Sequence, residues 1–182
     1  MSKITTLGLV TAAVLAIVMT LTVNTALSSP PTNETTTTVS NLTSTTPIYE
    51  QHSEVHGNRV IDVTNGSAKL EASYSGNGFA KSIYTVTDQG SLLYTLQSSG
   101  AVNGTGQGYI TSLDGEMVTY TLKGGGQADK DGNTSFQDTI HFNSIPSGNL
   151  AFLSNMKGTF KAEASNKGQI TFQVWPQNNT TY

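Results

Sequence analysis

The fold is decided by residues 102–128, which read VNGTGQGYITSLDGEMVTYTLKGGGQA. Val118, Tyr120 and Leu122 alternate with polar residues in this stretch, as expected for a strand with one buried face. The dipeptide Asp114-Gly115 comes before them, and Asp-Gly supplies the positive φ angles that a tight hairpin turn requires. Residues 102–113 and 116–128 are therefore predicted to form two antiparallel strands joined by this turn.

The same two-residue period continues on both sides of this hairpin. Further turn signals stand at Asn65-Gly66, Gly76-Asn77-Gly78, Asp88-Gln89-Gly90, Asp131-Gly132 and Asn166-Lys167-Gly168. The predicted strands are residues 58–64, 67–75, 78–88, 91–99, 102–113, 116–128, 133–144, 157–165 and 168–175. No stretch after residue 30 shows a helical stripe of apolar residues.

Consecutive hairpins with one buried face form a meander, and a meander of about eight strands can remove its exposed edges by closing into a barrel. Gly104, Gly106 and Gly108 fall on one face of their predicted strand, and Gly124-Gly125-Gly126 interrupts the next, as at barrel corners. We therefore predict an all-β fold, an antiparallel meander closed into a barrel over residues 55–176. A β-sandwich is the alternative.

The N-terminal residues predict an exported protein. Lys3 precedes a run without charge from Ile4 to Val23, which fits a signal peptide within residues 1–28. The run is also long enough to remain as an apolar helix that anchors the chain in a membrane. Residues 29–54 are rich in Thr and read as a disordered stalk, and residues 177–182 as a disordered tail. The barrel is expected at the cell surface, tethered or secreted.

Asn-X-Ser/Thr sequons, which accept N-linked glycans in exported proteins, occur in the stalk, the barrel and the tail. They begin at Asn33, Asn41, Asn65, Asn103, Asn133, Asn178 and Asn179. Glycosylation is one explanation, and the chance production of sequons by a chain rich in Thr and Asn is the other.

Composition excludes several classes of site and partner. The 182 residues contain no cysteine, so disulfides, thiolate nucleophiles and cysteine-based zinc sites are excluded. The formal net charge is −3, which does not suit a nucleic-acid partner.

Several segments together resemble a known group of proteins. They are GTGQGYITSLDGEMVTYT (residues 104–121), GGGQ (124–127), GNLAFLSNMKGTF (148–160) and QVW (173–175). This pattern resembles a family of small uncharacterised prokaryotic proteins, whose architecture is similar to the allene-oxide-cyclase-like β-barrel. The resemblance implies a barrel over the whole of residues 55–176 and implies no reaction or catalytic residue.

Asp138 is the candidate for a polar group inside the barrel. By alternation it shares a face with Phe136, Ile140 and Phe142, so we expect it to point into the lumen. A carboxylate there would have a raised pKa and could bind or protonate a ligand. The alternatives are a bulge that turns the side chain outward, or a buried acid satisfied by backbone amides.

For the other polar and aromatic groups, a structural role is expected over a functional one. Glu116 stands beside a turn, and His141 on a polar face is expected to be a surface residue rather than a base. His52, Glu54 and His56 could hold a metal, but two His residues four apart converge only on a helix, and none is indicated there. The Asp129–Asn133 loop is expected to be a hairpin turn rather than a calcium loop, because the EF-hand spacing fails. Tyr109 and Trp175 are expected in the core, with the lining of a ligand mouth as the alternative. No catalytic, cofactor or metal site is predicted.

Three hypotheses for function remain. The first is a non-enzymatic exported barrel that holds a small apolar ligand in its lumen. The second is a structural or adhesive surface module, and the third, a cyclase or isomerase, rests on fold analogy alone.

Overall fold

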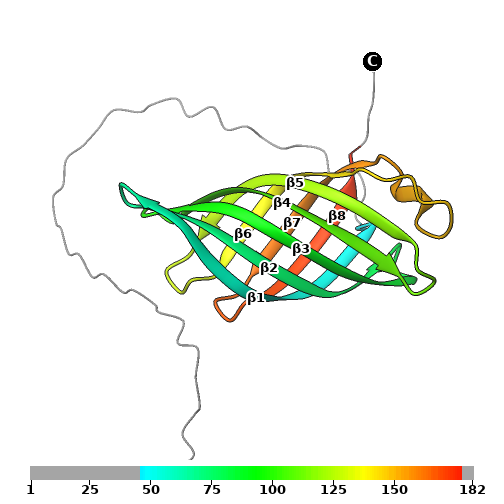
Figure 1. Ribbon diagram of the computed structural model, residues 1–182, viewed down its shortest axis with the longest axis horizontal. Helices are drawn as coiled ribbons and strands as arrows, with labels where there is room; N and C mark the ends of the chain where they lie inside the picture. The colour runs from blue at the N-terminus through cyan, green and yellow to red at the C-terminus, as the bar shows by residue number, and fades with distance from the viewer. Residues whose placement is uncertain (1–45, 178–182) are drawn as a thin grey trace, which may run out of the picture. The chain divides into compact units, whose positions relative to one another are not determined.

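The computed structural model describes residues 46–177, which form a closed antiparallel barrel (Figure 1). Its strands are β1 (Tyr49–Thr64), β2 (Ser67–Ala80), β3 (Tyr84–Gln97), β4 (Ala101–Ser112), β5 (Met117–Ala128), β6 (Thr134–Phe142), β7 (Lys157–Ala164) and β8 (Gln169–Pro176). A short 3-10 turn, η1, covers Ala151–Leu153. The predicted all-β barrel is confirmed, and the alternative β-sandwich is not what these residues form.

The predictions for residues 1–45 and 178–182 lie outside the described residues. They include the signal peptide or anchor, most of the stalk, the tail, and the sequons at Asn33, Asn41, Asn178 and Asn179. Between residues 46 and 177, no helix is long and apolar enough to cross a membrane.

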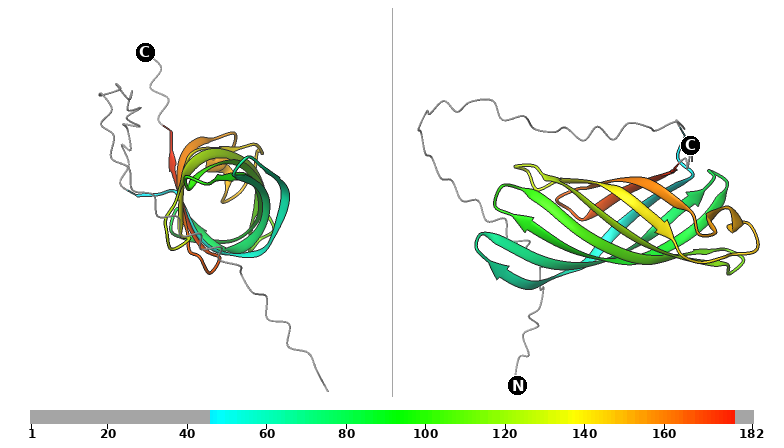
Figure 2. Two further views of the ribbon diagram at one scale, coloured as in Figure 1. Left: turned by 90° about the vertical axis from the view of Figure 1, so that its left-hand side faces the viewer. Right: turned by 90° about the horizontal axis from the view of Figure 1, so that it is seen from above.

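Each strand pairs with its neighbours in the chain, and β1 also pairs with β8. The closing pairing runs from Tyr49↔Val174 to Glu54↔Gln169. The view along the barrel axis shows the resulting ring of strands (Figure 2, left). Closure removes the exposed sheet edges along the body of the barrel, because each strand there has a partner on both sides. The outer part of β1, from Gly57 to Thr64, pairs with β2 alone.

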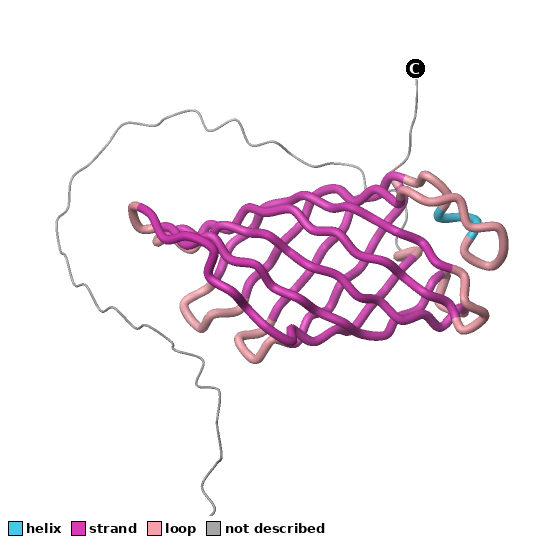
Figure 3. The backbone as a smooth tube through the Cα atoms, viewed as in Figure 1, coloured by secondary structure: helices cyan, strands magenta, loops and turns pink. Residues whose placement is uncertain are grey.

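The two ends of the barrel differ. The turns β1–β2, β3–β4, β5–β6 and β7–β8 lie at one end, called here the hairpin end, where the β1–β2 hairpin extends furthest (Figure 3). The opposite, plugged end carries the plug segment, residues 143–156, which joins β6 to β7 and contains η1. Leu150 and Leu153 of this segment are fully buried in the barrel core.

Two predicted turns prove to be strand interior. Gly76-Asn77-Gly78 lies within β2 and Asp88-Gln89-Gly90 within β3. The turn between these strands is instead made by Lys81 (φ 49°) and Ser82 (φ 59°). Glycine stands at position 76 because a Cβ there would come within 2.6 Å of the Ser53 Cα on β1. The three short strands predicted here, 67–75, 78–88 and 91–99, therefore give way to the two longer strands β2 and β3.

The barrel also begins earlier than predicted. β1 starts at Tyr49, so the boundary between stalk and barrel at residue 55 was placed too late. The alternation was not recognised because Gln51 and Ser53, the next two inward-facing residues after Tyr49, are polar.

The plugged end holds an apolar core. Val86, Ile110, Val118 and Phe142 are fully buried there with the leucines of the plug segment. Further along the axis, the ring of Phe160 packs between Phe136 and Phe172, with centroid distances of 5.5 and 5.2 Å. The predicted inward positions of β5, Val118, Tyr120 and Leu122, are all buried, as their alternation indicated.

Glu116 fastens the plug segment to the barrel. Its carboxylate accepts a hydrogen bond from the backbone N–H of Leu150 at 3.0 Å and another from that of Gly148. The side chain is half-buried between the β4–β5 turn and the plug segment, so it has a structural role beyond that of an exposed turn residue.

We expect Glu116→Ala to destabilise the protein by about 1–3 kcal/mol, because two backbone donors near the core lose their charged acceptor. Urea unfolding followed by tryptophan fluorescence measures the change. Glu163→Ala is the control, since Glu163 forms only an exposed ion pair with Lys161 and should cost about 0–1 kcal/mol. Equal losses in the two variants would contradict the role given to Glu116.

Candidate functional site

A buried carboxylate lies at the centre of the barrel. Asp88 of β3 is 1% exposed and faces inward beside Val86. The hydroxyl of Tyr120, on β5, donates to its Oδ1 at 2.8 Å, and the hydroxyl of Tyr49, on β1, donates to its Oδ2 at 2.8 Å. Since β1, β3 and β5 are not adjacent in the sheet, these hydrogen bonds cross the lumen.

Further polar side chains extend this pair of hydrogen bonds. The hydroxyl oxygens of Tyr74 and Tyr120 lie 2.6 Å apart, and the Tyr49 hydroxyl lies 3.1 Å from Gln51 Oε1. The Gln51 Nε2 in turn donates a hydrogen bond to the Ser53 hydroxyl. All these groups are buried, and we call them the Asp88 cluster: Tyr49, Gln51, Ser53, Tyr74, Asp88 and Tyr120.

Two glycines make room for the tyrosine rings. Tyr74 is paired across strands with Gly90, and Tyr120 with Gly108. A Cβ at Gly90 would lie 2.6 Å from the Tyr74 Cζ, and one at Gly108 would lie 2.6 Å from the Tyr120 Cζ. The rings therefore lie against the glycine backbone of the neighbouring strand, an arrangement that also covers the glycines.

Burial sets the protonation of the cluster. It raises the pKa of Asp88 to about 6, although the hydrogen bonds from Tyr120 and Tyr49 act in the opposite direction. Burial, together with the charge of Asp88, also raises the pKa values of Tyr49, Tyr74 and Tyr120. The tyrosines are therefore neutral hydrogen-bond donors near pH 7, and Asp88 exchanges its proton close to neutrality.

The hydrogen-bond partners of Tyr49 agree with a proton that exchanges on Asp88 close to neutrality. The Tyr49 hydroxyl has one proton, yet its oxygen lies within hydrogen-bond distance of two acceptors, Asp88 Oδ2 and Gln51 Oε1. A proton on Oδ2 resolves the conflict, because Asp88 then donates to Tyr49, and Tyr49 donates to Gln51. An ionised Asp88 instead requires the Gln51 amide to turn over, so that its Nε2 donates to Tyr49.

On the other side of the carboxylate, the direction of the hydrogen bonds depends on the proton of Asp88. While Oδ1 is unprotonated, Tyr120 gives its proton to this oxygen, and the proton between the two hydroxyls then comes from Tyr74. Tyr74 is also the most exposed member of the cluster, at 8%. With Oδ1 unprotonated, Tyr74 has only acceptor capacity left for a further partner.

Inward-facing apolar residues surround the lumen between the cluster and the hairpin end. They continue the buried faces of their strands but are only half-buried. We call them the mouth: Val55, Leu70, Leu92, Tyr94, Leu96, Phe136 and Ile170. Leu92, Phe136 and Ile170 pack against the buried core, so the mouth is continuous with it.

The prediction that Asp138 is the acid inside the barrel is wrong. Asp138 is exposed and lies along a shallow surface depression with Lys69 and Lys123. The interior beside it is filled by the rings of Phe136 and Phe160, which offer no hydrogen-bond donor to a carboxylate. Asp88 is the acid whose side chain faces the barrel interior.

The remaining predicted residues do not join the cluster. Tyr109 is partly exposed and donates to Gln89, and the exposed His56 contacts Ser75. In the Asp129–Asn133 turn, the Asp129 carboxylate accepts from the N–H groups of Asp131 and Asn133, as in a tight hairpin. Of the sequons, those at Asn65, Asn103 and Asn133 are exposed. Residues 46–177 contain no group of three His, Asp or Glu side chains placed to hold a metal ion.

Sequence reasoning missed Asp88 and Tyr49 for definite reasons. Asp88 stands in Asp-Gln-Gly, which resembles a turn, and Tyr49 fell inside the predicted stalk. The usable signal was Val86, Asp88, Gly90 and Leu92 at alternate positions, which matches the inward face of one long strand.

The comparisons with known proteins support the fold. No family model and no curated protein sequence matches this chain. Three chains of solved structures match it. One is the crystal structure of a conserved protein of unknown function from Rhodopseudomonas palustris, with a TM-score of 0.59 and 9% identity over 70% of this chain and 93% of that one. At this identity the similarity shows a shared β-barrel fold.

Asp88 is expected to make stability depend on pH. Its pKa is raised above the ordinary value of 3.8, so the folded state holds this proton more tightly than the unfolded state between about pH 4 and 6. The free energy of unfolding should therefore fall by about 3 kcal/mol as the pH rises through this window, and Asp88 should cause no further change above it.

Urea unfolding at several pH values, compared between wild type and Asp88→Asn, isolates this contribution. The variant should lack the fall, and the exposed Asp138→Asn should retain it. Identical pH profiles for wild type and Asp88→Asn would contradict the assignment.

Proposed function

We propose that this chain is an exported β-barrel that binds a small, mainly apolar molecule through its hairpin end. The observation that carries the proposal is the half-buried apolar mouth above the buried Asp88 cluster. Leu92 and Phe136 are inward-facing and only partly covered by the rest of the protein, so a ligand would gain apolar contact there. Small-molecule sites are typically apolar with a few fixed polar groups.

The cluster also specifies the polar group of the ligand. With Asp88 ionised, Tyr120 donates to the carboxylate, so Tyr74 uses its proton on Tyr120 and keeps only acceptor capacity. A ligand with a hydroxyl or amine would donate to Tyr74, whereas a ligand with only an ether or carbonyl oxygen would find no donor there. The proposed ligand class is therefore a small apolar molecule that carries one hydrogen-bond donor.

The proposal also includes that the protein is exported and that it belongs to a family of small barrels. The apolar run Ile4–Val23, the Thr-rich stalk and the exposed sequons support display outside a membrane, tethered if the run is not cleaved. The segments 104–127 and 148–160 support membership of a group of small prokaryotic barrels that resemble allene oxide cyclase. Neither argument assigns a reaction.

A cyclase or isomerase is a second candidate, favoured only by the near-neutral pKa of Asp88. A catalytic carboxylate must contact its substrate, but Asp88 is 1% exposed and lies behind Tyr74 and Tyr120. Binding is therefore the better-supported function.

Two matched probes test the ligand class. 1-Naphthol and 1-methoxynaphthalene share the same apolar body, but only naphthol has a hydroxyl proton. Naphthol should bind more tightly, by about three- to tenfold, and Tyr74→Phe should remove this difference without weakening the ether. Fluorescence titration measures both affinities.

Leu92→Glu and Leu93→Glu form a control pair, because Leu92 faces the mouth and Leu93 the outer surface of the same strand. Only Leu92→Glu should abolish binding of both probes, provided that circular dichroism shows both variants to be folded. Absence of binding in wild type, or equal loss in both variants, would overturn the proposed function.

Export can be tested by expressing the full chain in its source cell, separating the fractions and measuring the mass of the purified protein. We expect the barrel outside the cytoplasm, with residues 1–28 removed or retained in the membrane fraction. If glycans are present, Asn65→Gln should lower the mass, because Asn65 is exposed at the tip of the β1–β2 turn. Cytoplasmic protein that retains Met1 would refute export.

A further inference from the structure

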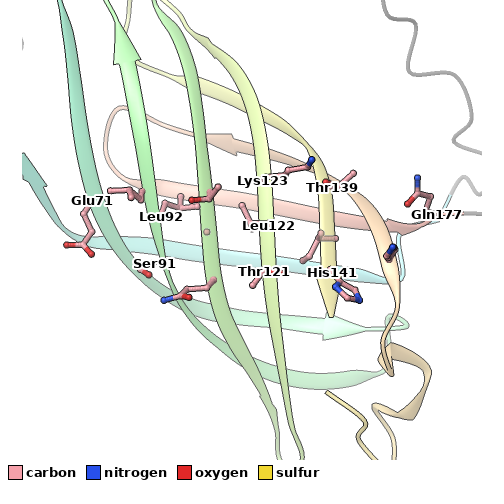
Figure 4. Close-up of a pocket in the computed structure, with 15 residues that line it drawn as sticks. Glu71, Ser91, Leu92, Thr121, Leu122, Lys123, Thr139, His141 and Gln177 are labelled. Carbon is pink, nitrogen blue, oxygen red and sulfur yellow. The ribbon is translucent and has the colours of Figure 1, made fainter. Parts of the chain in front are cut away.

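A concave site lies on the outside of the barrel wall, and Leu92 is the residue that it shares with the mouth. This outer groove has a volume of about 800 Å³, within the range of small-molecule sites. Figure 4 shows Ser91, Thr121, Lys123, Thr139 and His141 along it.

The strand register arranges the outward side chains of the groove in two rows. One row runs Ser91, Gln107, Thr121, His141 and Lys157, each directly paired with the next. The other runs Leu93, Thr105, Lys123 and Thr139 in the same way. Hydroxyl and amide groups both donate and accept hydrogen bonds, so these rows suit a ligand with many hydroxyl groups.

The hollow follows from a missing side chain on the inner face of β4. A Cβ at Gly106 would lie 2.6 Å from Leu92 Cδ2 and 3.0 Å from Leu122 Cδ1. Glycine therefore lets β4 approach the interior side chains of its two neighbours closely. Gly106 forms part of the floor of the outer groove.

The groove is positively charged, although the chain as a whole has a net charge of −3. It contains Lys123 and Lys157, while its one carboxylate, Glu71, is paired with Arg59 at 2.6 Å. The other salt bridge within residues 46–177 joins Lys161 to Glu163, so neither groove lysine is in an ion pair. Two ammonium groups are therefore available to an anionic ligand.

We propose that the outer groove binds an acidic oligosaccharide, whose carboxylates pair with Lys123 and Lys157 and whose hydroxyls bond to the rows of Thr, Ser and Gln. This site is independent of the ligand in the mouth and adds an adhesive function to the barrel.

The alternatives fit the groove less well. A neutral sugar commonly depends on stacking against aromatic rings, yet His141 supplies the one ring among the lining residues. Single-stranded nucleic acid also needs aromatic stacking platforms together with a basic surface, and the chain has a pI near 5.5.

The experiment uses trigalacturonic acid, its methyl ester and a short oligothymidylate, each titrated calorimetrically into the protein. The acid should bind, with an affinity that falls as salt rises, and the ester should bind at least about tenfold more weakly because its carboxylates are masked. The double variant Lys123→Gln/Lys157→Gln should lose at least about tenfold for the acid, whereas Lys161→Gln/Lys167→Gln should bind as wild type does.

A second blocking variant, Thr121→Trp, fills the groove without changing its charge and should also weaken binding of the acid. Naphthol binding in the mouth serves as the folding control for every variant and should be unchanged. Three results would overturn the proposal: no binding of the acid, equal loss in the two double variants, or tighter binding of the oligothymidylate. If naphthol binds neither the wild type nor any variant, the mouth proposal fails. Binding of trigalacturonic acid then still tests the groove proposal.

Discussion

Strand β1 pairs with β8 from Tyr49↔Val174 to Glu54↔Gln169, and the rest of the structure depends on this closure. Without it, both strands would expose a row of unpaired backbone N–H and C=O groups. The same segment of β1 carries Tyr49, Gln51 and Ser53 on its inner face, so closing the sheet also brings half of the Asp88 cluster into place. The second half of β1 pairs with β2 alone, and it forms the exposed hairpin that projects beyond the barrel.

The interior changes in character along the barrel axis. At the plugged end, residues such as Val86 and Phe142 are fully buried, and the plug segment excludes solvent. The Asp88 cluster comes next, and no buried side-chain nitrogen or oxygen within residues 46–177 lacks a hydrogen-bond partner. Taking a carboxyl group out of water costs free energy, and fixed tyrosine hydroxyls offset much of that cost. Beyond the cluster the apolar side chains are only half-covered, and the proposed ligand is placed at this end of the lumen for that reason.

Alternation predicted the strands well where the inner face is apolar, as at Val118, Tyr120 and Leu122. It failed where glycine has a packing role rather than a turn role, because Gly76 and Gly90 look the same in sequence as turn glycines. It also failed at Asp138, since a period of two indicates a face but cannot say whether the space on that face is already filled by Phe136 and Phe160. The polar start of β1 was missed for a related reason, as Gln51 and Ser53 give no apolar signal.

The sequence by itself determined the all-β class, most of the hairpins, the absence of cysteine chemistry and the expectation of export, because each depends on composition or on local periodicity. Only the tertiary structure decided the site. The hydrogen bonds of Asp88 join it to Tyr49 and Tyr120, 39 and 32 residues away, and Tyr74 meets Tyr120 across 46 residues. Such contacts depend on the register of every strand pair and on the closure between β1 and β8. Local periodicity specifies neither of these, since register and closure depend on how residues far apart in the chain pack together.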